Sequence, residues 1–381
     1  MKESRIIYLD NAATTRPIKA LETLMTEYRE DKWYNPSALY KGSSEAEADM
    51  AAVRKTLLDA VGGYDRQAVF TASGSEANNM AIFDAVKPRE SCHFVFSAYE
   101  HAAVYACAKM LMDSGHEVTF VAPDERGVVS AKSVTDAIKG NTVLVGVMHV
   151  NNETGALNDI DDIAAGVKAA KKDVHFHSDG VQAFLKVPYS LSGHVDSYAV
   201  SAHKIGALKG TGALLIKNGA KLRPIILGGS QEKGMRAGTE NTFGIAAFGC
   251  AVENFPADDA HIFELHHRLI AGFGKLEKVV VNSPTGDGLY SPYIVNASVL
   301  GVRSETLLHA LEAKGIYIGI GSACSSKTRT NRIHDALKLS PERGESAVRI
   351  SFSHENTAED VDTLLETIDS EARFLRMFTR R

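Results

Sequence analysis

Cysteine is scarce in this sequence, with four residues among 381. None are paired as C-x-x-C, which argues against a zinc knuckle or a thioredoxin-like redox motif, and four scattered cysteines cannot supply a disulfide framework for so long a chain. Cys92, Cys107 and Cys250 are predicted to be packing residues, because a free cysteine often behaves as a small buried hydrophobe. Cys324 has different neighbours and is considered below.

Long apolar runs and an excess of positive charge are also missing. The longest apolar stretch, residues 143–150, is far below the ~18 residues that a transmembrane helix requires. With 42 Lys+Arg against 47 Asp+Glu, the net charge is −5, which argues against direct binding of nucleic acid. The opening residues MKESRIIYLDNAATT contain no apolar signal-peptide core, so we expect a cytoplasmic protein without a membrane partner.

Hydrophobic residues make up 44% of the sequence, as in a folded globular protein. Short apolar segments that predict strands alternate with amphipathic segments that predict helices, among them 44–61, 76–86, 103–114 and 160–171. This alternation is typical of βαβ units, so we expect an α/β fold with a mostly parallel seven-stranded sheet and helices on both faces. The predicted strands are residues 67–71, 92–97, 117–121, 142–150, 174–178, 197–201 and 211–216.

A change in composition near residue 255 predicts a second, smaller α+β domain. The predicted division is a large domain at 15–255 and a small domain formed by 1–14 and 256–381. The expected order after residue 255 follows from the hydrophobic periodicity. It is helix 260–276, strand 279–281, strand 294–300, helix 305–314, a Gly/Ser-rich loop, strand 347–352 and helix 358–376.

The segment SYAVSAHKIGALKGTG runs from an apolar strand into a glycine-rich turn and presents His203 and Lys204. A lysine that emerges from a strand into a buried loop can lose its charge and act as a nucleophilic amine. A Schiff base with pyridoxal 5′-phosphate (PLP) requires such an amine. For this segment alone, a solvated turn lysine remains the alternative, because most lysines are exposed.

The segment HFHSDGVQ places Asp179 just beyond another strand, one strand–turn–strand unit before Lys204. PLP chemistry needs an acid against the pyridinium nitrogen, so that the ring accepts electrons. A helix N-cap before residues 180–184 is the alternative role for this aspartate. His175 and His177 could be a metal pair, but two histidines without a third ligand favour packing or surface positions, and we predict no metal site.

Other strand ends carry polar residues as well. FTASGSEANN opens a helix after a strand, and its Gly74 and Ser75 suit a phosphate at a helix N-terminus, although a plain serine-capped helix looks similar. His101 follows a strand and could lie on the face of a flat cofactor, while Asn152 could hydrogen-bond a hydroxyl or a carboxylate. The carboxyl ends of parallel strands form the ligand-binding edge of an open α/β sheet.

Together these segments resemble the PLP-dependent cysteine desulfurases of the class V aminotransferase-like group, whose fold is PLP fold type I. The combination is specific, although each motif alone is weak. The matching motifs follow one another over nearly the whole chain. They are YLDNAATT (8–15), NPS (35–37), SGSEANN (73–79), EH (100–101), VNNETG (150–155), SDGVQ (178–182), SAHK (201–204), GGSQEKGMRAGTEN (228–241), GSACSS (321–326) and VRISF (348–352).

The resemblance implies a role for each matched residue. Lys204 would be the Schiff-base lysine, and Asp179 would be the partner of the pyridinium nitrogen. His101 would stack on the ring and shuttle protons. Gln182 would bond the ring hydroxyl, and Asn152 would lie between cofactor and substrate.

The resemblance also implies how the phosphate and the substrate are bound. Arg349 would clamp the substrate carboxylate, a task that suits a bidentate guanidinium, whereas a surface ion pair is its alternative role. Thr239 would reach the phosphate from a second subunit, so a homodimer is expected. The other residues implied for the phosphate are Gly74, Ser75, Ser201 and His203.

Cys324 is the candidate nucleophile. It lies in a polar loop of small residues with Lys327 and Arg329 nearby, surroundings that favour a reactive thiolate. The implied reaction converts L-cysteine to L-alanine and leaves the sulfur on Cys324 as a persulfide. An acceptor protein would then receive this sulfur for iron–sulfur cluster assembly or tRNA thiolation.

Alternatives stay open at this point. An aminotransferase or a selenocysteine lyase could use the same fold, and a non-catalytic scaffold could have kept it. The sequence departs from the family pattern in three places: ALKG at 207–210 replaces the usual Gly-Pro-Lys-Gly turn, Tyr40 stands where a histidine is usual, and SFSHE at 351–355 replaces a Leu-Gly-Arg continuation. These departures leave the subgroup and the sulfur acceptor open.

Overall fold

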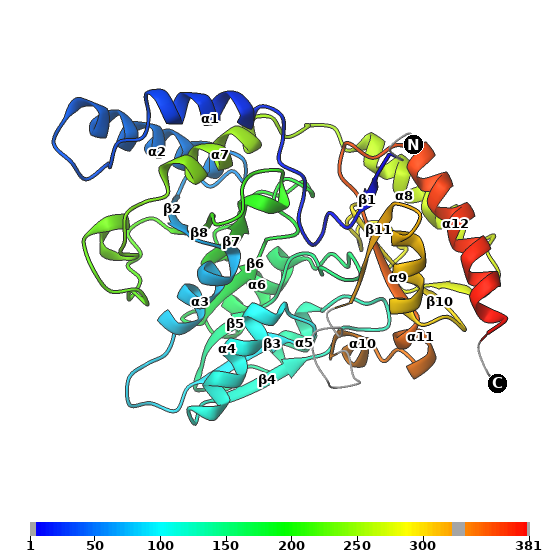
Figure 1. The fold of residues 1–381 in the computed structure, drawn as a ribbon. Helices are drawn as coiled ribbons and strands as arrows, with labels where there is room; N and C mark the ends of the chain where they lie inside the picture. Colours follow the sequence, from blue (N-terminus) through cyan, green and yellow to red (C-terminus); the bar gives the residue numbers. More distant parts are fainter. Residues whose placement is uncertain (1–4, 322–331, 379–381) are drawn as a thin grey trace.

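Two separate sheets organise the protein, whose computed structural model describes residues 5–321 and 332–378. Figure 1 shows the larger sheet on the left and the smaller one on the right, with the first strand of the chain, β1, in the smaller sheet. The strand order is β2-β8-β7-β6-β5-β3-β4 in the larger sheet and β1-β11-β12-β10-β9 in the smaller one.

The larger sheet confirms the expected α/β architecture. Of its described strands, only β8 runs against its neighbours, β2 and β7. The carboxyl ends of the other six therefore point to one edge, where loops can converge on a ligand. The strands are β2 (Arg66–Thr71), β3 (His93–Ser97), β4 (Glu117–Val121), β5 (Thr142–Gly146), β6 (His175–Asp179), β7 (Ser197–Ser201) and β8 (Gly212–Lys217).

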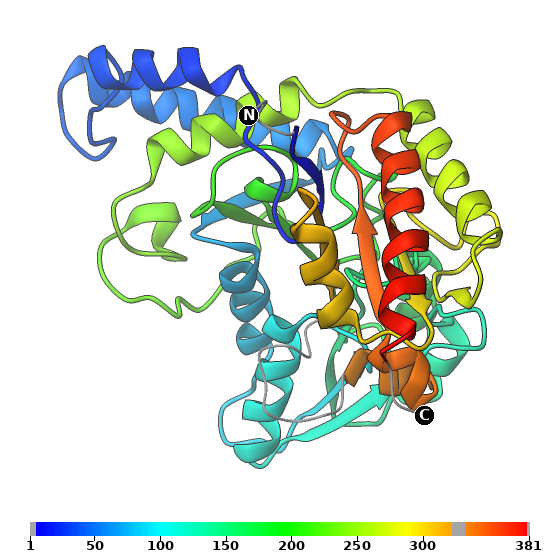
Figure 2. The ribbon, with the colours of Figure 1, turned by 45° about the vertical axis from the view of Figure 1, so that its right-hand side comes forward.

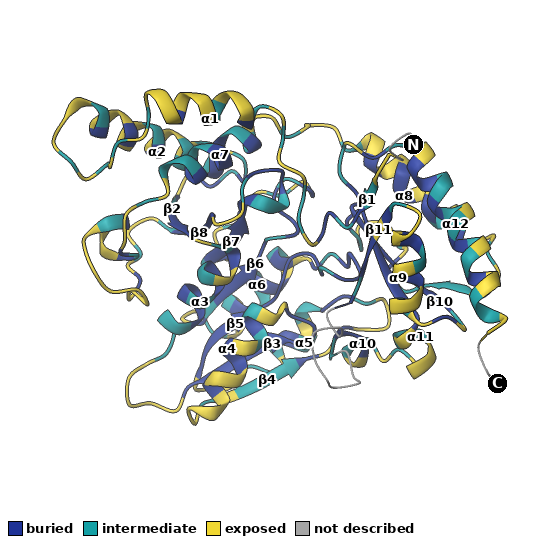
Figure 3. Cartoon of the chain, viewed as in Figure 1, coloured by how far each residue is buried: buried dark blue, intermediate teal, exposed yellow. Residues whose placement is uncertain are grey.

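Helices cover both faces of this sheet, because successive side chains of a strand point to opposite sides. In β2, Phe70 belongs to the same hydrophobic cluster as residues of α2, α6 and α7, whereas its neighbour Val69 belongs to a cluster with residues of α3. Figure 3 shows most of the strands of this sheet as buried, with the edge strand β4 largely intermediate, and the outer sides of the helices as exposed. The helices are α1 (Leu21–Glu30), α2 (Lys41–Asp59), α3 (Gly74–Asp84), α4 (Ala102–Asp113), α5 (Ala131–Thr135), α6 (Ile160–Ala170) and α7 (Thr242–Glu253).

The smaller sheet confirms the α+β unit and has a hydrophobic core of its own. Helices α8, α9 and α12 cover one of its faces, as Figure 2 shows. The division at residue 255 stays a prediction, which the separate core and the place of β1 support. The elements are β1 (Ile7–Leu9), α8 (Ala260–Phe273), β9 (Val279–Val281), β10 (Ile294–Val299), α9 (Ser304–Glu312), β11 (Ile316–Ile320), α10 (Arg332–Ala336), α11 (Pro341–Glu345), β12 (Ala347–Ser351) and α12 (Ala358–Arg376).

Two expectations about strands are wrong. The strand predicted at 142–150 ends at Gly146, where the chain leaves the ladder with β3. The prediction ran too far because the following residues are equally apolar and buried. The Gly/Ser-rich loop expected after α9 begins with β11, a central strand of the smaller sheet.

Three cysteines lie in the described part of the chain. Cys92 and Cys107 are buried, which confirms them as packing residues, and Cys250 is half-buried on α7. Among the helices of residues 5–321 and 332–378, none is long and apolar enough to cross a membrane.

Candidate active site

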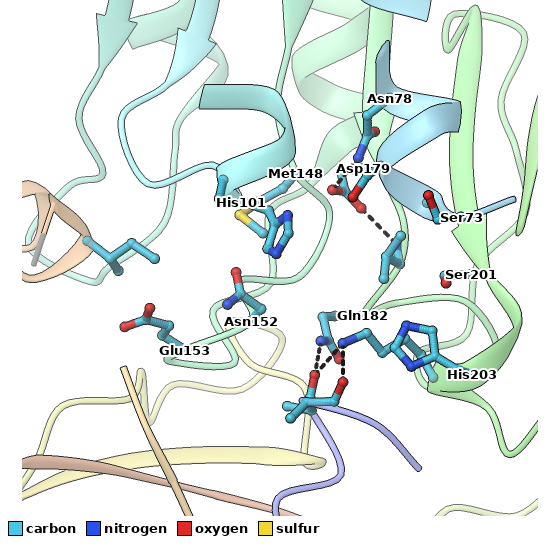
Figure 4. A pocket seen from close by; sticks show the side chains of 18 of the residues that line it. Ser73, Asn78, His101, Met148, Asn152, Glu153, Asp179, Gln182, Ser201 and His203 are labelled. Carbon is cyan, nitrogen blue, oxygen red and sulfur yellow. Dashed lines mark hydrogen bonds between the residues drawn. The ribbon is translucent and has the colours of Figure 1, made fainter. Parts of the chain in front are cut away.

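A cavity of about 420 Å³ lies at the carboxyl ends of the parallel strands, of a size that suits a small-molecule ligand. Figure 4 shows polar side chains from several strand ends around this space. Most residues that the sequence singled out line the cavity. They are Gly74, Ser75, His101, Asn152, Asp179, Gln182, Ser201, His203, Lys204 and Arg349.

Asp179 is the last residue of β6 and is almost fully buried. Its Oδ1 accepts a hydrogen bond from the Val181 amide (3.0 Å), and its Oδ2 accepts one from Asn78 Nδ2 (2.7 Å). The segment after Asp179 forms turns rather than a helix, so the N-cap interpretation is wrong. Hydrogen bonds from the chain thus hold both oxygens of this carboxylate in place.

Lys204 ends a short 3-10 turn (Ala202–Lys204) that directly follows β7. Its Nζ donates to the carbonyl oxygens of Ala12 (2.6 Å) and Ala13 (2.9 Å), which belong to the segment after β1. Burial, and next the positive charge of Arg349, lower the pKa of Lys204 to about 8. The interpretation as a solvated turn lysine is therefore wrong.

This lowered pKa predicts the reactivity of Lys204 in the absence of any cofactor. An amine reacts only when neutral, and an ordinary lysine has a pKa of about 10.4. We expect acetylation of Lys204 by acetic anhydride to rise with pH around a midpoint near 8, as measured by mass spectrometry of the Lys204 peptide. A midpoint equal to that of a free lysine peptide would contradict the prediction.

His101 projects into the cavity from the N-cap of α4, where its Nδ1 accepts a hydrogen bond from the Ala103 amide (3.2 Å). Burial lowers the pKa of His101, so the imidazole is held neutral. The preceding Glu100 is fully enclosed, and burial raises its pKa to about 8. Glu100 accepts hydrogen bonds from the Ser97 hydroxyl and the Met148 amide. These two bonds connect the end of β3 with the segment that follows β5, next to His101.

The N-terminus of α3 opens onto the cavity opposite Ser201. A Cβ on Gly74 would lie 2.6 Å from Val181 Cγ2, so only glycine allows this close approach. The carboxylate of Glu76 in the first turn is held by Arg236, whose Nε donates to it at 2.8 Å. The free amides of the first turn can therefore receive an anion, since the helix dipole favours negative charge there.

Arg349 lies on β12 and is buried. It does form an ion pair, but the pair is not at the surface, so the interpretation as a surface ion pair is wrong. One Nη donates to Asp10 Oδ1 (2.7 Å) and the other to the Asn152 carbonyl oxygen (2.8 Å). Gly319 leaves room for this pair, because a Cβ there would lie 2.5 Å from Asp10 Oδ1. The guanidinium thus faces the cavity as part of a buried ion pair.

Three buried polar atoms at the cavity have no hydrogen-bond partner within the described residues. They are Gln182 Oε1, Asn152 Oδ1 and Arg349 Nε. Buried polar atoms are normally hydrogen-bonded, so such atoms indicate a missing ligand. A ligand with a phosphate, a hydroxyl and a ring nitrogen, such as PLP, fits the α3 terminus, Gln182 and Asp179.

Two sequence-predicted residues are not at the cavity. Thr239 is exposed and borders a separate hollow with Thr71 and Asn241, so this chain does not bring it to its own cavity. Cys324 lies outside the described residues.

The sequence interpretation missed Arg332 and gave no role to Asn78. Arg332 lines the cavity and donates to the carbonyl oxygens of Ala98 (2.6 Å) and Glu100, which ties α10 to the turn that carries His101. No motif marks this arginine. Asn78 lies within the motif SGSEANN, which is the sequence signal that could have found it, and the structure places it among the buried residues of α3.

The histidine pair on β6 is not a metal site. His175 Nε2 and His177 Nδ1 both hydrogen-bond the Ser197 hydroxyl, at 2.7 and 2.8 Å. Within the described ranges, no three His, Cys, Asp or Glu side chains could hold a metal ion together.

Known proteins resemble this chain over nearly its whole length. The family model described as aminotransferase class-V matches residues 7–364. The cysteine desulfurase IscS of Clostridium botulinum (strain Hall) is 35% identical over 371 residues, which cover 95% of this chain and 93% of that protein. The cysteine desulfurase IscS of Methanosarcina thermophila is 34% identical over 382 residues, which cover 98% and 94%.

Solved structures agree with these relatives. A NifS-like protein superposes with a TM-score of 0.88 at 30% identity, over 97% of this chain and 100% of that chain. SspA in complex with cysteine superposes with a TM-score of 0.79 at 30% identity, over 91% and 98%. The chain therefore belongs to the aminotransferase class-V family and, within it, to the cysteine desulfurases.

Proposed function

We propose that this protein is a PLP-dependent cysteine desulfurase that converts L-cysteine to L-alanine and retains the sulfur on Cys324 as a persulfide. The observation that carries the proposal is the meeting of the Lys204 amine, the Asp179 carboxylate and the His101 imidazole in one cavity. The cysteine desulfurases that the chain resembles support the substrate, and SspA was solved with cysteine.

The residues that would hold PLP follow three strands, β2, β6 and β7. The first turn of α3, Ser201 and His203 suit the phosphate, and Gln182 suits the ring hydroxyl. Asp179 suits the ring nitrogen, because a carboxylate there keeps this nitrogen protonated. When bound, PLP supplies an electron sink for bond changes at the carbon atoms of the substrate amino acid.

Other residues of this chain would handle the substrate and its protons. Arg349 suits the carboxylate of cysteine. Asn152 lies beside it, and its Oδ1 has no partner among residues 5–321 and 332–378. His101 is held neutral and accepts from the Ala103 amide at Nδ1, so its proton lies on Nε2, which can donate it in the cavity. Lys204, with a pKa of about 8, can both give and take a proton near neutral pH.

The sulfur transfer itself is assigned to Cys324 from the sequence. Its thiolate would attack the sulfur atom of the substrate, forming an S–S bond while the substrate C–S bond breaks. The electron pair of the C–S bond stays with the carbon, which takes up protons and leaves as L-alanine. The persulfide sulfur then passes to an acceptor protein for iron–sulfur cluster assembly or tRNA thiolation.

Mass spectrometry after incubation with L-cysteine tests the proposal. We expect one additional sulfur atom on the peptide that contains Cys324, together with release of L-alanine. The matched control is Cys250→Ser, a half-buried cysteine outside the cavity, which should leave both results unchanged. Cys324→Ser should remove the adduct and reduce alanine release.

The same experiment separates the rival functions. Alanine release that persists in Cys324→Ser, with sulfur discharged as free sulfide, would contradict the persulfide step. Amino-group transfer to a keto acid would favour an aminotransferase, and preference for L-selenocysteine would favour a selenocysteine lyase. A colourless protein that takes up no PLP would favour a non-catalytic scaffold.

A homodimer completes the proposal. Thr239 lies away from the cavity of its own chain, as expected if it serves a second copy. The large side chains of Trp33, Leu39 and Leu227 are exposed at 66%, 102% and 83%, and a second copy could cover them. The cytoplasmic location stays a prediction.

A further inference from the structure

A chain of buried polar side chains extends from Asp179 into the interior of the larger sheet. Asn78 on α3 donates from Nδ2 to Asp179 Oδ2 (2.7 Å), as Figure 4 shows, and its Oδ1 lies 2.8 Å from His177 Nε2. His177 Nδ1 lies 2.8 Å from Ser197 Oγ, which in turn lies 2.7 Å from His175 Nε2.

The carboxylate determines which atom of Asn78 faces it. An ionised carboxylate can only accept hydrogen bonds, so the Asn78 amide must turn its NH₂ group toward Asp179. Its carbonyl oxygen then faces His177 and can only accept. His177 must therefore carry its proton on Nε2.

The remaining members follow in the same way. Burial lowers the pKa of His177 to about 3, so the ring is neutral and its Nδ1 is an acceptor. The Ser197 hydroxyl must donate to that Nδ1, which leaves its oxygen to accept from His175 Nε2. Every donor in the chain thus points toward Asp179. Hydrogen bonds arranged in one direction polarise each other and strengthen the last bond.

We propose that Asn78 and His177 are positioning residues, which hold the Asp179 carboxylate in place and stabilise its charge against the ring nitrogen of bound PLP. This inference rests on the proposed function, because it needs PLP in the cavity. Asn78 borders the cavity and hydrogen-bonds Asp179 directly, whereas His177 reaches Asp179 through Asn78. Without Asn78, Oδ2 of the almost fully buried Asp179 would lose its side-chain donor.

A pair of ligands that differ at the ring nitrogen tests the proposal by binding rather than by activity. PLP is compared with 1-deazapyridoxal 5′-phosphate, in which C–H replaces that nitrogen. Dissociation constants are measured by fluorescence on the full-length protein after removal of bound cofactor with hydroxylamine. The informative quantity is the dissociation constant of the deaza ligand divided by that of PLP. A general loosening of the cavity weakens the binding of both ligands alike and leaves this ratio unchanged.

We expect Asn78→Leu, a change of similar shape, to reduce this ratio by about tenfold or more, since hydrogen bonds to charged groups are the strong ones. The matched control is Asn79→Leu on the same helix, whose side chain donates to the Ser75 carbonyl oxygen (2.7 Å) rather than to Asp179. It should leave the ratio unchanged. A ratio in Asn78→Leu equal to that of the unmodified protein would overturn the inference.

A second pair of variants covers a failure of Asn78→Leu to fold. His177→Gln can still donate to Asn78 Oδ1 and should keep most of the ratio, whereas His177→Phe should reduce it. Equal ratios in these two variants would overturn the role of His177. If the unmodified protein bound neither ligand, the proposed function would fail together with the inference. Binding of PLP with unchanged ratios would contradict the inference alone.

Discussion

Lys204→Ala is expected to reduce alanine release from L-cysteine by at least about 10⁴-fold, because it removes both a nucleophile and a proton-transfer group. In the unmodified protein, the Lys204 amine enters the cavity directly after β7 and donates hydrogen bonds to the carbonyl oxygens of Ala12 and Ala13. The rate should be measured at saturating PLP, so that weaker retention of the cofactor does not account for the loss.

The matched control for this variant is Lys209→Ala, an exposed lysine five positions further along the same segment. It should keep the activity of the unmodified protein. A Lys204→Ala protein with more than a tenth of the original rate would contradict the assignment of Lys204.

Asp179→Asn is expected to lower the rate by roughly 10²- to 10⁴-fold, which corresponds to the ~3–5 kcal/mol lost when one partner of a buried charge pair is removed. Asparagine keeps the shape of the side chain but cannot hold the ring nitrogen in its protonated form. The measurement is kcat for alanine release at saturating cysteine and PLP. A reduced kcat with little change in KM would locate the loss in the reaction steps.

The control for this variant is Asp173→Asn, an exposed carboxylate just before β6. Removal of its charge leaves the cavity unchanged, so kcat should stay at the original value. If both variants lost activity equally, a general effect on β6 rather than the cofactor contact would be responsible.

Local patterns predicted the larger sheet and most of the candidate site. Its strands and helices are short apolar or amphipathic segments in continuous sequence, and Asp179 and Lys204 follow strands directly. Since the carboxyl ends of parallel strands share one edge, their meeting in one cavity could be expected. The motifs of the resemblance led to Gln182 and Arg349.

Pairings between distant segments could not be predicted in this way. The strand β11 reads as the start of a loop, because it is short, contains Gly319 and finds its partners near both ends of the chain. The pairing of Arg349 with Asp10 depends on the same long-range contact. Arg332 acts through backbone carbonyl oxygens, which carry no sequence signal.

The place of β1 has a consequence for the order in which the protein matures. The segment after β1 supplies the carbonyl oxygens that hold Lys204, yet β1 pairs with β11, and Asp10 bridges to Ser351. During synthesis on the ribosome, β1 emerges before the larger sheet and must wait for β11 and β12, which follow that sheet in the sequence. The larger sheet can assemble earlier, so the reactive lysine acquires its final surroundings only after β12 has been made.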